Sequence, residues 1–138
     1  MIKTLLARFQ GATAIRFLIV GVSAAVLYFV LFSVFYIYFD YFAFVATVFA
    51  YSIAFGCAYL AHKFWTYQSS VPVAQSLPRY FILQLLSVAA TSLVTQFSVS
   101  VLGLESFLVS IVATLFAGVF NYIFSSLWVF SSVEKTAK

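Results

Sequence analysis

Charged residues are scarce in this chain. Its 138 residues include seven Lys and Arg and three Asp and Glu, so charged side chains make up 7% of the sequence while apolar ones make up 65%. A soluble domain usually carries about 25% charged residues. A chain with so few of them cannot cover itself with polar surface, which excludes a water-soluble globular protein and indicates a lipid environment.

Residues that carry chemistry are also scarce. His62 and Cys57 are each the only residue of their type, which rules out a disulfide within the chain and argues against a metal site. The sequence has no pair of close carboxylates, no Gly-rich phosphate loop and no plausible Ser/His/Asp set. We therefore predict no catalytic residues, no metal, no cofactor, no nucleic-acid partner and no enzymatic activity.

Long apolar runs are what the sequence does have. Residues 17–39, 41–61, 80–104 and 106–133 contain no Asp, Glu, Lys or Arg. A helix needs about 20 apolar residues to cross a bilayer core of about 30 Å. The runs do not alternate as the strands of a membrane barrel would, and helices satisfy their backbone internally in lipid. The predicted fold class is therefore an all-α integral membrane protein with four transmembrane helices.

The predicted spans are roughly 15–37, 42–62, 80–102 and 106–128. The connection over 63–79 contains Pro72 and Pro78 and is predicted to be irregular. The first apolar run continues to Phe39, beyond the 7–15 residues of a signal-peptide core, so we interpret it as a retained span.

The residues before the first span suggest a short helix on the membrane surface. Ile2, Leu5, Leu6 and Phe9 share one helical face, which is typical of such a helix. The alternative, that these residues extend the first span, stays open.

The basic residues predict the orientation. All of them lie in the N-terminal segment, the central connection or the C-terminal tail: Lys3, Arg8, Arg16, Lys63, Arg79, Lys135 and Lys138. With four spans, these three places lie on one side of the membrane, and the positive-inside rule makes that side cytoplasmic. The turns around Asp40 and Glu105 contain no basic residue and are predicted to lie outside.

A pattern of residues occurs twice. Arg16-Phe17 and Trp65-Thr66-Tyr67 enclose the first copy, and Arg79-Tyr80 and Trp128-Val129-Phe130 enclose the second, 63 residues later. The spacing from Arg to Trp is 49 residues in both copies. A repeat of this length indicates a duplicated unit. We predict a single domain over 1–138 made of two parallel helical hairpins, about 14–67 and 77–130.

Two helices have small residues at every fourth position. The second span has Ala46, Ala50, Ala54 and Ala58, and the fourth has Ser110, Thr114 and Gly118. Such stripes let helices approach closely, either within the chain or between subunits.

The basic residues predicted on the cytoplasmic side have two possible roles. Arg16, Lys63 and Arg79 flank spans, where basic side chains commonly extend to lipid headgroups. Alternatively they bind an anion, because Arg fits phosphate oxygens in a bidentate manner and helix N-termini attract negative charge. The aromatic residues Trp65, Tyr67, Trp128 and Phe130 are predicted at the same interface, where aromatic belts are expected.

The third span is unusually polar. Five of its polar residues recur every three to four positions: Gln84, Ser87, Thr91, Thr95 and Ser98. Ser92 and Gln96 lie beside this stripe, and the fourth span adds Asn121. Hydrogen bonds between helices would use such residues, at about 0.6 kcal/mol each. We favour a groove that solvates a polar headgroup, because the stripe is longer than helix packing needs.

Three stretches of the sequence resemble the GtrA-like family. They are Arg16-Phe17-Leu18-Ile19-Val20-Gly21, then His62-Lys63-Phe64-Trp65-Thr66-Tyr67, and finally residues 121–130, which begin Asn121-Tyr122 and end Trp128-Val129-Phe130. The resemblance covers about residues 14–131. His62 replaces the family's Asn, and Ser125-Ser126 replaces Asn-Arg in the second copy. Only the first copy keeps its cation, Lys63.

The resemblance implies a protein of the bacterial cytoplasmic membrane that moves a polyprenyl-phosphate-linked sugar between leaflets for cell-surface polysaccharide synthesis. For such a substrate, we expect the phosphate to bind at Arg16, His62, Lys63 and Arg79. The sugar path would follow Gln84, Thr91, Thr95, Gln96 and Asn121. The expected partners are membrane lipid, a membrane glycosyltransferase and further copies of the chain, as a homodimer or higher oligomer.

Two other functions share features with this sequence. A non-catalytic partner that recruits or stabilises a glycosyltransferase stays open as the alternative. A small multidrug exporter has a similar size and four spans, but that type depends on an acidic residue within a span. Asp40 and Glu105 both lie between spans here.

Overall fold

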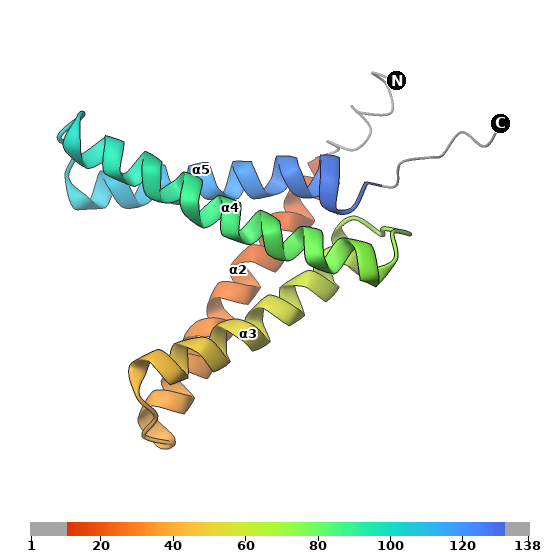
Figure 1. The fold of residues 1–138 in the computed structure, drawn as a ribbon, viewed down its shortest axis with the longest axis horizontal. Helices are drawn as coiled ribbons and strands as arrows, with labels where there is room; N and C mark the ends of the chain where they lie inside the picture. The colour runs from red at the N-terminus through yellow and green to blue at the C-terminus, as the bar shows by residue number, and fades with distance from the viewer. Residues whose placement is uncertain (1–10, 132–138) are drawn as a thin grey trace. The chain divides into compact units, whose positions relative to one another are not determined.

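The computed structural model describes residues 11–131, and all regular structure within this range is helical. The elements are α2 (Gly11–Ser33), η1 (Val34–Tyr38), α3 (Ala43–Ala61), η2 (His62–Thr66), α4 (Val73–Ser100), α5 (Ser106–Phe124) and η3 (Ser125–Val129), where η denotes a π-helical turn (Figure 1). The predicted surface helix over residues 2–9 lies outside the described residues.

The elements join into helices long and apolar enough to cross a membrane. They run over Gly11–Tyr38, Ala43–Thr66, Val73–Ser100 and Ser106–Val129. Large apolar side chains point outward along them, with Phe44 80%, Leu93 72% and Phe107 74% exposed. Such a surface suits lipid rather than water. The predicted fold class is confirmed, and the chain is a multi-pass membrane protein.

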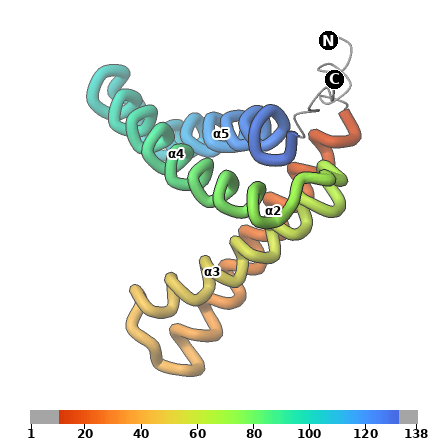
Figure 2. Tube along the Cα trace, turned by 45° about the vertical axis from the view of Figure 1, so that its right-hand side comes forward, coloured from red at the N-terminus to blue at the C-terminus, as the bar shows by residue number. Residues whose placement is uncertain are grey.

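The start of the third helix differs from its prediction. The helix begins at Val73 rather than near residue 80, and Pro78 lies inside it. The irregular connection is therefore shorter than the predicted 63–79: residues 67–72 contain no helix, whereas Lys63 and Arg79 are both helical. Pro78 has a backbone φ that suits a helix, but it lacks the N–H that would bond the Ala74 carbonyl, and its ring crowds that carbonyl. Figure 2 shows the curved course of α4, as is common in helices that contain proline.

The chain divides into two compact units, Met1–Gln68 (unit 1) and Ser69–Lys138 (unit 2). In unit 1, α2 packs against α3, and in unit 2, α4 packs against α5. Each unit is thus a pair of helices joined by a short turn, which Figure 1 shows at the ends of α2 and α4. We call these two turns, around Asp40 and Gly103, the outer turns because they lie at the end of each hairpin away from the repeated Arg and Trp.

The two stripes of small residues differ in burial. Ala46 and Ala50 are 0% exposed and Ala54 is 5% exposed on α3, so this stripe packs within the chain, which is one of the two predicted alternatives. On α5, by contrast, Ser110, Thr114 and Gly118 are exposed in the described chain. The second stripe therefore does not serve packing within its own hairpin.

The outer turns repeat the same backbone geometry. Asp40 has a φ of 50° and Gly103 has a φ of 59°, and these residues are 63 positions apart, like the rest of the repeat. Asp and Gly both tolerate this left-handed conformation. The Tyr41 amide donates to the Phe35 carbonyl in unit 1, and the equivalent Leu104 amide donates to the Ser98 carbonyl in unit 2. The duplication read from the sequence is thus present in the backbone.

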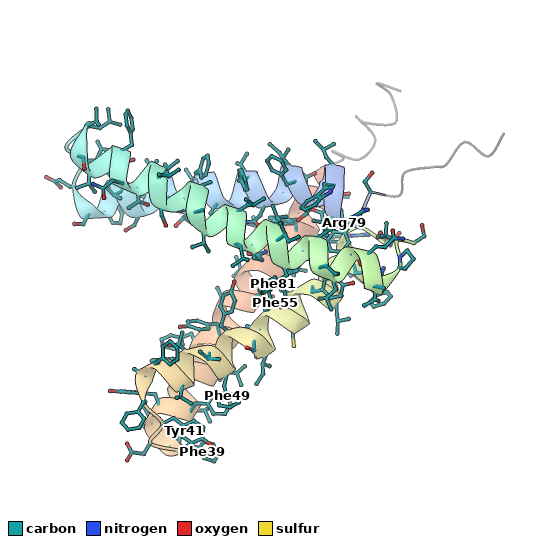
Figure 3. All side chains as sticks on the ribbon, in the orientation of Figure 1. Phe39, Tyr41, Phe49, Phe55, Arg79 and Phe81 are labelled. Atoms are coloured by element: carbon teal, nitrogen blue, oxygen red, sulfur yellow. The ribbon has the colours of Figure 1, made fainter. Side chains whose placement is uncertain are left out.

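Aromatic rings stabilise the outer turn of unit 1. Tyr41 lies 6.0 Å from Phe35, 5.9 Å from Phe39 and 6.2 Å from Phe49, measured between ring centroids. Figure 3 shows Phe39, Tyr41 and Phe49 together at this end of the hairpin. Pairs at such distances contribute beyond the area they bury.

Candidate functional site

The repeated Arg and Trp are hydrogen-bonded partners. The Arg16 guanidinium donates to the Trp65 carbonyl at 3.3 Å, and the Arg79 guanidinium donates to the Trp128 carbonyl at 3.3 Å. The last carbonyls of a helix have no partner within the helix, and a basic side chain can satisfy them. Each Arg therefore connects the beginning of one helix to the end of the next, and closes its hairpin.

This contact gives each of the two arginines a structural role. Their position at the start of a span left lipid anchoring and anion binding open, and the structure adds a role within each hairpin. Arg16 also lies 5.7 Å from the centroid of the Trp65 ring, a cation–π distance. A guanidinium carries five N–H donors, so one such bond leaves donors for a further ligand. The equal spacing of 49 residues in both copies was the sequence signal for this pair.

The η2 turn brings together the predicted site residues of unit 1. His62 and Lys63 are each 4% exposed and Thr66 is 3% exposed. His62 Nδ1 lies 3.2 Å from Thr66 Oγ1, and the Phe17 ring stacks on the His62 ring at 4.7 Å. Lys63 is therefore buried in a π-helical turn, a feature frequently found at functional sites.

The equivalent η3 turn of unit 2 contains no charge. Ser125 and Ser126 replace His62 and Lys63, and they are 0% and 3% exposed. Ser126 donates to the Tyr122 carbonyl at 2.8 Å, whereas Ser125 Oγ is buried without a partner. Figure 3 labels Arg79, which lies on α4 and is the basic residue of unit 2 within the part of the chain that the structure describes.

The predicted interface aromatics differ in exposure. Trp65 is 44% and Trp128 36% exposed, whereas Phe130 is 6% exposed and lies 6.1 Å from the Tyr80 ring. Tyr67 packs against Phe17 and His62, at 6.5 and 6.0 Å. The two tryptophans are thus the outward-facing members of this set.

The structure brings the five predicted sugar-path residues together in one groove of unit 2. The groove has a volume of about 470 Å³, and its lining is Gln84, Ser87, Val88, Thr91, Ser92, Thr95, Gln96, Ala117 and Asn121. Most of these side chains are polar, although both helices are long and apolar enough to span a membrane. The polar stripe of α4 thus faces a groove next to α5.

Asn121 is held in one orientation in this groove. Its Nδ2 donates to the Ala117 carbonyl at 2.9 Å and to Ser87 Oγ at 2.7 Å. A carbonyl only accepts hydrogen bonds, so the amino group and not the oxygen must face Ala117. Ser87 and Asn121 lie on different helices, and their bond links α4 to α5.

The oxygen on the other side of the amide has no partner. Asn121 Oδ1 and Thr91 Oγ1 are both buried without a hydrogen bond. Buried polar atoms are almost always paired, and leaving one unpaired costs about 1–3 kcal/mol. Both atoms belong to residues that line one groove, so a small movement of either side chain would turn an acceptor or a hydroxyl toward a ligand. A ligand rich in hydroxyl groups would satisfy both.

The chain matches a known protein family. The family model described as GtrA/DPMS, transmembrane domain, matches residues 16–130. The chain belongs to this family. The resemblance noted in the sequence is therefore confirmed, and membership indicates a membrane role related to glycosyl-carrier lipids. No curated protein and no solved structure matches the chain.

Proposed function

We propose that this GtrA/DPMS family member translocates a polyprenyl-phosphate-linked sugar across the bacterial cytoplasmic membrane, for cell-surface polysaccharide synthesis or glycosylation. The observation that carries the proposal is the pair of unpartnered buried atoms, Asn121 Oδ1 and Thr91 Oγ1, in a polar groove between membrane-spanning helices. Membership of the family supplies the class of lipid.

The groove would lower the main energetic cost of moving a sugar through a bilayer, which is the loss of hydrogen-bond partners by its hydroxyl groups. Each hydroxyl moved from water into hydrocarbon without a partner costs about 4–8 kcal/mol, on the scale of transfer to cyclohexane. Side chains along α4 offer partners in succession, from Gln84 through Thr91 to Thr95. A sugar that moves along them exchanges one set of hydrogen bonds for another.

The phosphate of the carrier would bind to basic residues. In unit 1, Arg16 lies beside Trp65, and the buried Lys63 and His62 belong to the adjoining turn. Arg79 is the corresponding candidate in unit 2. Guanidinium groups bind phosphate oxygens through paired hydrogen bonds, and this chemistry supports the assignment of Arg16 and Arg79. Lys63 would contribute as a point charge and His62 as a hydrogen-bond donor.

The proposed transport is downhill. Within residues 11–131 the carboxylates are Asp40 and Glu105, and both lie in the outer turns rather than inside a membrane helix. Proton-coupled carriers place acidic groups within spans. We therefore propose that use of the sugar by a glycosyltransferase on the outer side drives the movement, with the protein acting as a homodimer or higher oligomer.

Leaflet transfer in proteoliposomes tests the proposal. The substrate is a short-chain polyprenyl-phosphate sugar, and transfer is read as accessibility of the sugar to an external reagent. The combined change Thr91→Val, Thr95→Val and Gln96→Leu should lower the initial rate by at least about tenfold, since 1.4 kcal/mol corresponds to tenfold. The control is Ser110→Ala with Thr114→Val on the exposed face of α5, which should leave the rate unchanged.

The result also separates the two candidate functions. Unchanged transfer in the triple variant would refute the sugar path and favour a non-catalytic partner of a glycosyltransferase. The phosphate assignment has its own test, the double change Lys63→Ala and Arg79→Ala. We expect this variant, once shown by circular dichroism to be folded, to transfer much more slowly, and wild-type transfer would refute the assignment.

A further inference from the structure

Unit 1 contains an apolar groove near the end of its hairpin where η2 lies. The groove has a volume of about 270 Å³, and its lining includes Val20, Ala24, Leu27, Ala58, Ala61 and Trp65. It runs between α2 and α3 and reaches the Trp65 ring. Almost all of its surface is hydrocarbon, so it cannot hydrogen-bond a sugar.

The repeat shows where the two units have diverged. Ala24 and Ala58 occupy the positions in unit 1 that Ser87 and Asn121 occupy in unit 2, 63 residues later. In unit 2 this pair forms the hydrogen bond that orients the amide in the polar groove. In unit 1 the same positions carry only methyl groups and line the apolar groove. The two hairpins therefore offer opposite chemistry at equivalent positions.

A cation lies at one end of the unit 1 groove. The Arg16 guanidinium is 5.7 Å from the Trp65 ring centroid and donates to the Trp65 carbonyl at 3.3 Å. A second apolar groove, on α5 in unit 2, also measures about 270 Å³ but is lined by Phe107, Ser110, Ile111, Thr114 and Leu115, none of them charged. Charge therefore distinguishes two grooves of equal size. The first suits an amphiphile with an apolar chain and an anionic head.

The floor of the groove indicates the kind of chain. Small residues, Ala24, Ala58 and Ala61, line the groove together with larger ones such as Leu27 and Trp65, so we expect its surface to be uneven. Apolar chains bind best where protrusions fill recesses, since voids forfeit dispersion contacts. A straight acyl chain has no protrusions, whereas each isoprene unit carries a methyl branch.

We propose that this groove of unit 1 binds the isoprenoid chain of a polyprenyl phosphate, with the phosphate beside Arg16. The inference rests on the proposed function for the identity of the ligand, and it adds a second binding region in a different unit from the sugar path. It predicts that the lipid chain contacts the protein instead of remaining in bulk lipid.

Cys57 makes the groove directly measurable. It is the single cysteine of the chain, lines the groove and is exposed. We would measure its alkylation rate by N-ethylmaleimide in the purified full chain in nanodiscs, with farnesyl phosphate as the probe. Occupancy at ten times the dissociation constant should slow alkylation about tenfold. Dodecyl phosphate, a straight chain of the same backbone length, and farnesol, which lacks the phosphate, should each protect much less.

Variants in the two matched grooves complete the test. Ala24→Phe fills the unit 1 groove, and its ratio of alkylation rates without and with farnesyl phosphate should fall to about one. Ala61→Leu is a milder filling in case the first variant fails to fold. Thr114→Phe fills the groove of equal volume in unit 2 and should retain full protection.

The outcomes distinguish this inference from the proposed function. Equal protection by farnesyl phosphate and dodecyl phosphate, or full protection in both filled variants, would overturn the isoprenoid groove, even if leaflet transfer occurs. Protection specific to farnesyl phosphate, with no transfer in proteoliposomes, would support the groove and refute translocation.

Discussion

Replacing Asn121 with leucine should separate stability from transport. The amide makes one bond between helices, from Nδ2 to Ser87 Oγ at 2.7 Å, and leaves Oδ1 buried without a partner. If Asn121 served only to hold α5 against α4, its loss would weaken the fold. If it serves a ligand, the resting protein should tolerate the change.

The magnitudes favour tolerance. A hydrogen bond between membrane helices contributes about 0.6 kcal/mol on average. An unpaired buried polar atom costs about 1–3 kcal/mol, and leucine removes it. We therefore expect Asn121→Leu to unfold with a free energy equal to or about 1 kcal/mol higher than that of the wild type. Transfer of the lipid-linked sugar should fall about tenfold, because a lost hydrogen bond to a moving hydroxyl costs about 1.4 kcal/mol.

The complementary change is Ser87→Ala. It removes one of the two acceptors of Nδ2 while leaving the amide and its bond to the Ala117 carbonyl in place. One N–H of the amide then lacks a partner, so unfolding should become easier by about 1 kcal/mol. Reversible unfolding in bicelles measures both variants, and proteoliposomes measure transfer. A large loss of stability in Asn121→Leu with wild-type transfer would refute the reasoning, since the amide would then be a structural element alone.

Three further predictions concern packing. Ser125→Ala should stabilise unit 2 by about 1 kcal/mol, because it removes a buried hydroxyl that has no partner. Ser126→Ala should not stabilise the unit, because the Ser126 hydroxyl bonds the Tyr122 carbonyl. Thermal unfolding of both variants measures the difference, and equal effects would contradict the prediction. Ala50→Leu should destabilise the α2–α3 packing by about 1–3 kcal/mol, because Ala50 is 0% exposed and a larger side chain does not fit there. The control Ala25→Leu, on the exposed face of α2, should be neutral in the same assay. Pro78→Ala should restore a helical hydrogen bond and raise the free energy of unfolding by about 1 kcal/mol; a lower value would show that the bend at Pro78 is needed for packing.

The helices could be predicted because lipid imposes a simple rule. Runs without charge, such as 41–61 and 80–104, must form hydrogen-bonded helices if they cross a bilayer, whatever their local propensities. Helix ends were less predictable. Pro78 looked like part of a loop, yet its φ suits a helix and α4 includes it.

The candidate site was predictable in its membership but not in its geometry. Spacing of three to four residues placed Gln84, Thr91 and Thr95 on one face, and the groove contains them. No pattern in the sequence showed that the Asn121 amide is oriented by Ala117, because that bond depends on a side-chain rotamer. Burial of Lys63 was also missed, since a basic residue at the end of a span normally reaches water.

The hydrogen bond from each Arg to the carbonyl of its own Trp has a consequence for how the chain can be divided. Arg16 and Trp65 both precede Gln68, and Arg79 and Trp128 both follow it, so neither closure crosses the boundary between Gln68 and Ser69. Ser69 likewise bonds the Phe130 carbonyl of its own unit at 3.0 Å. A gene interrupted at this boundary would encode two fragments, each with its closing contact intact. Co-expression of the two fragments should then restore what the single chain does.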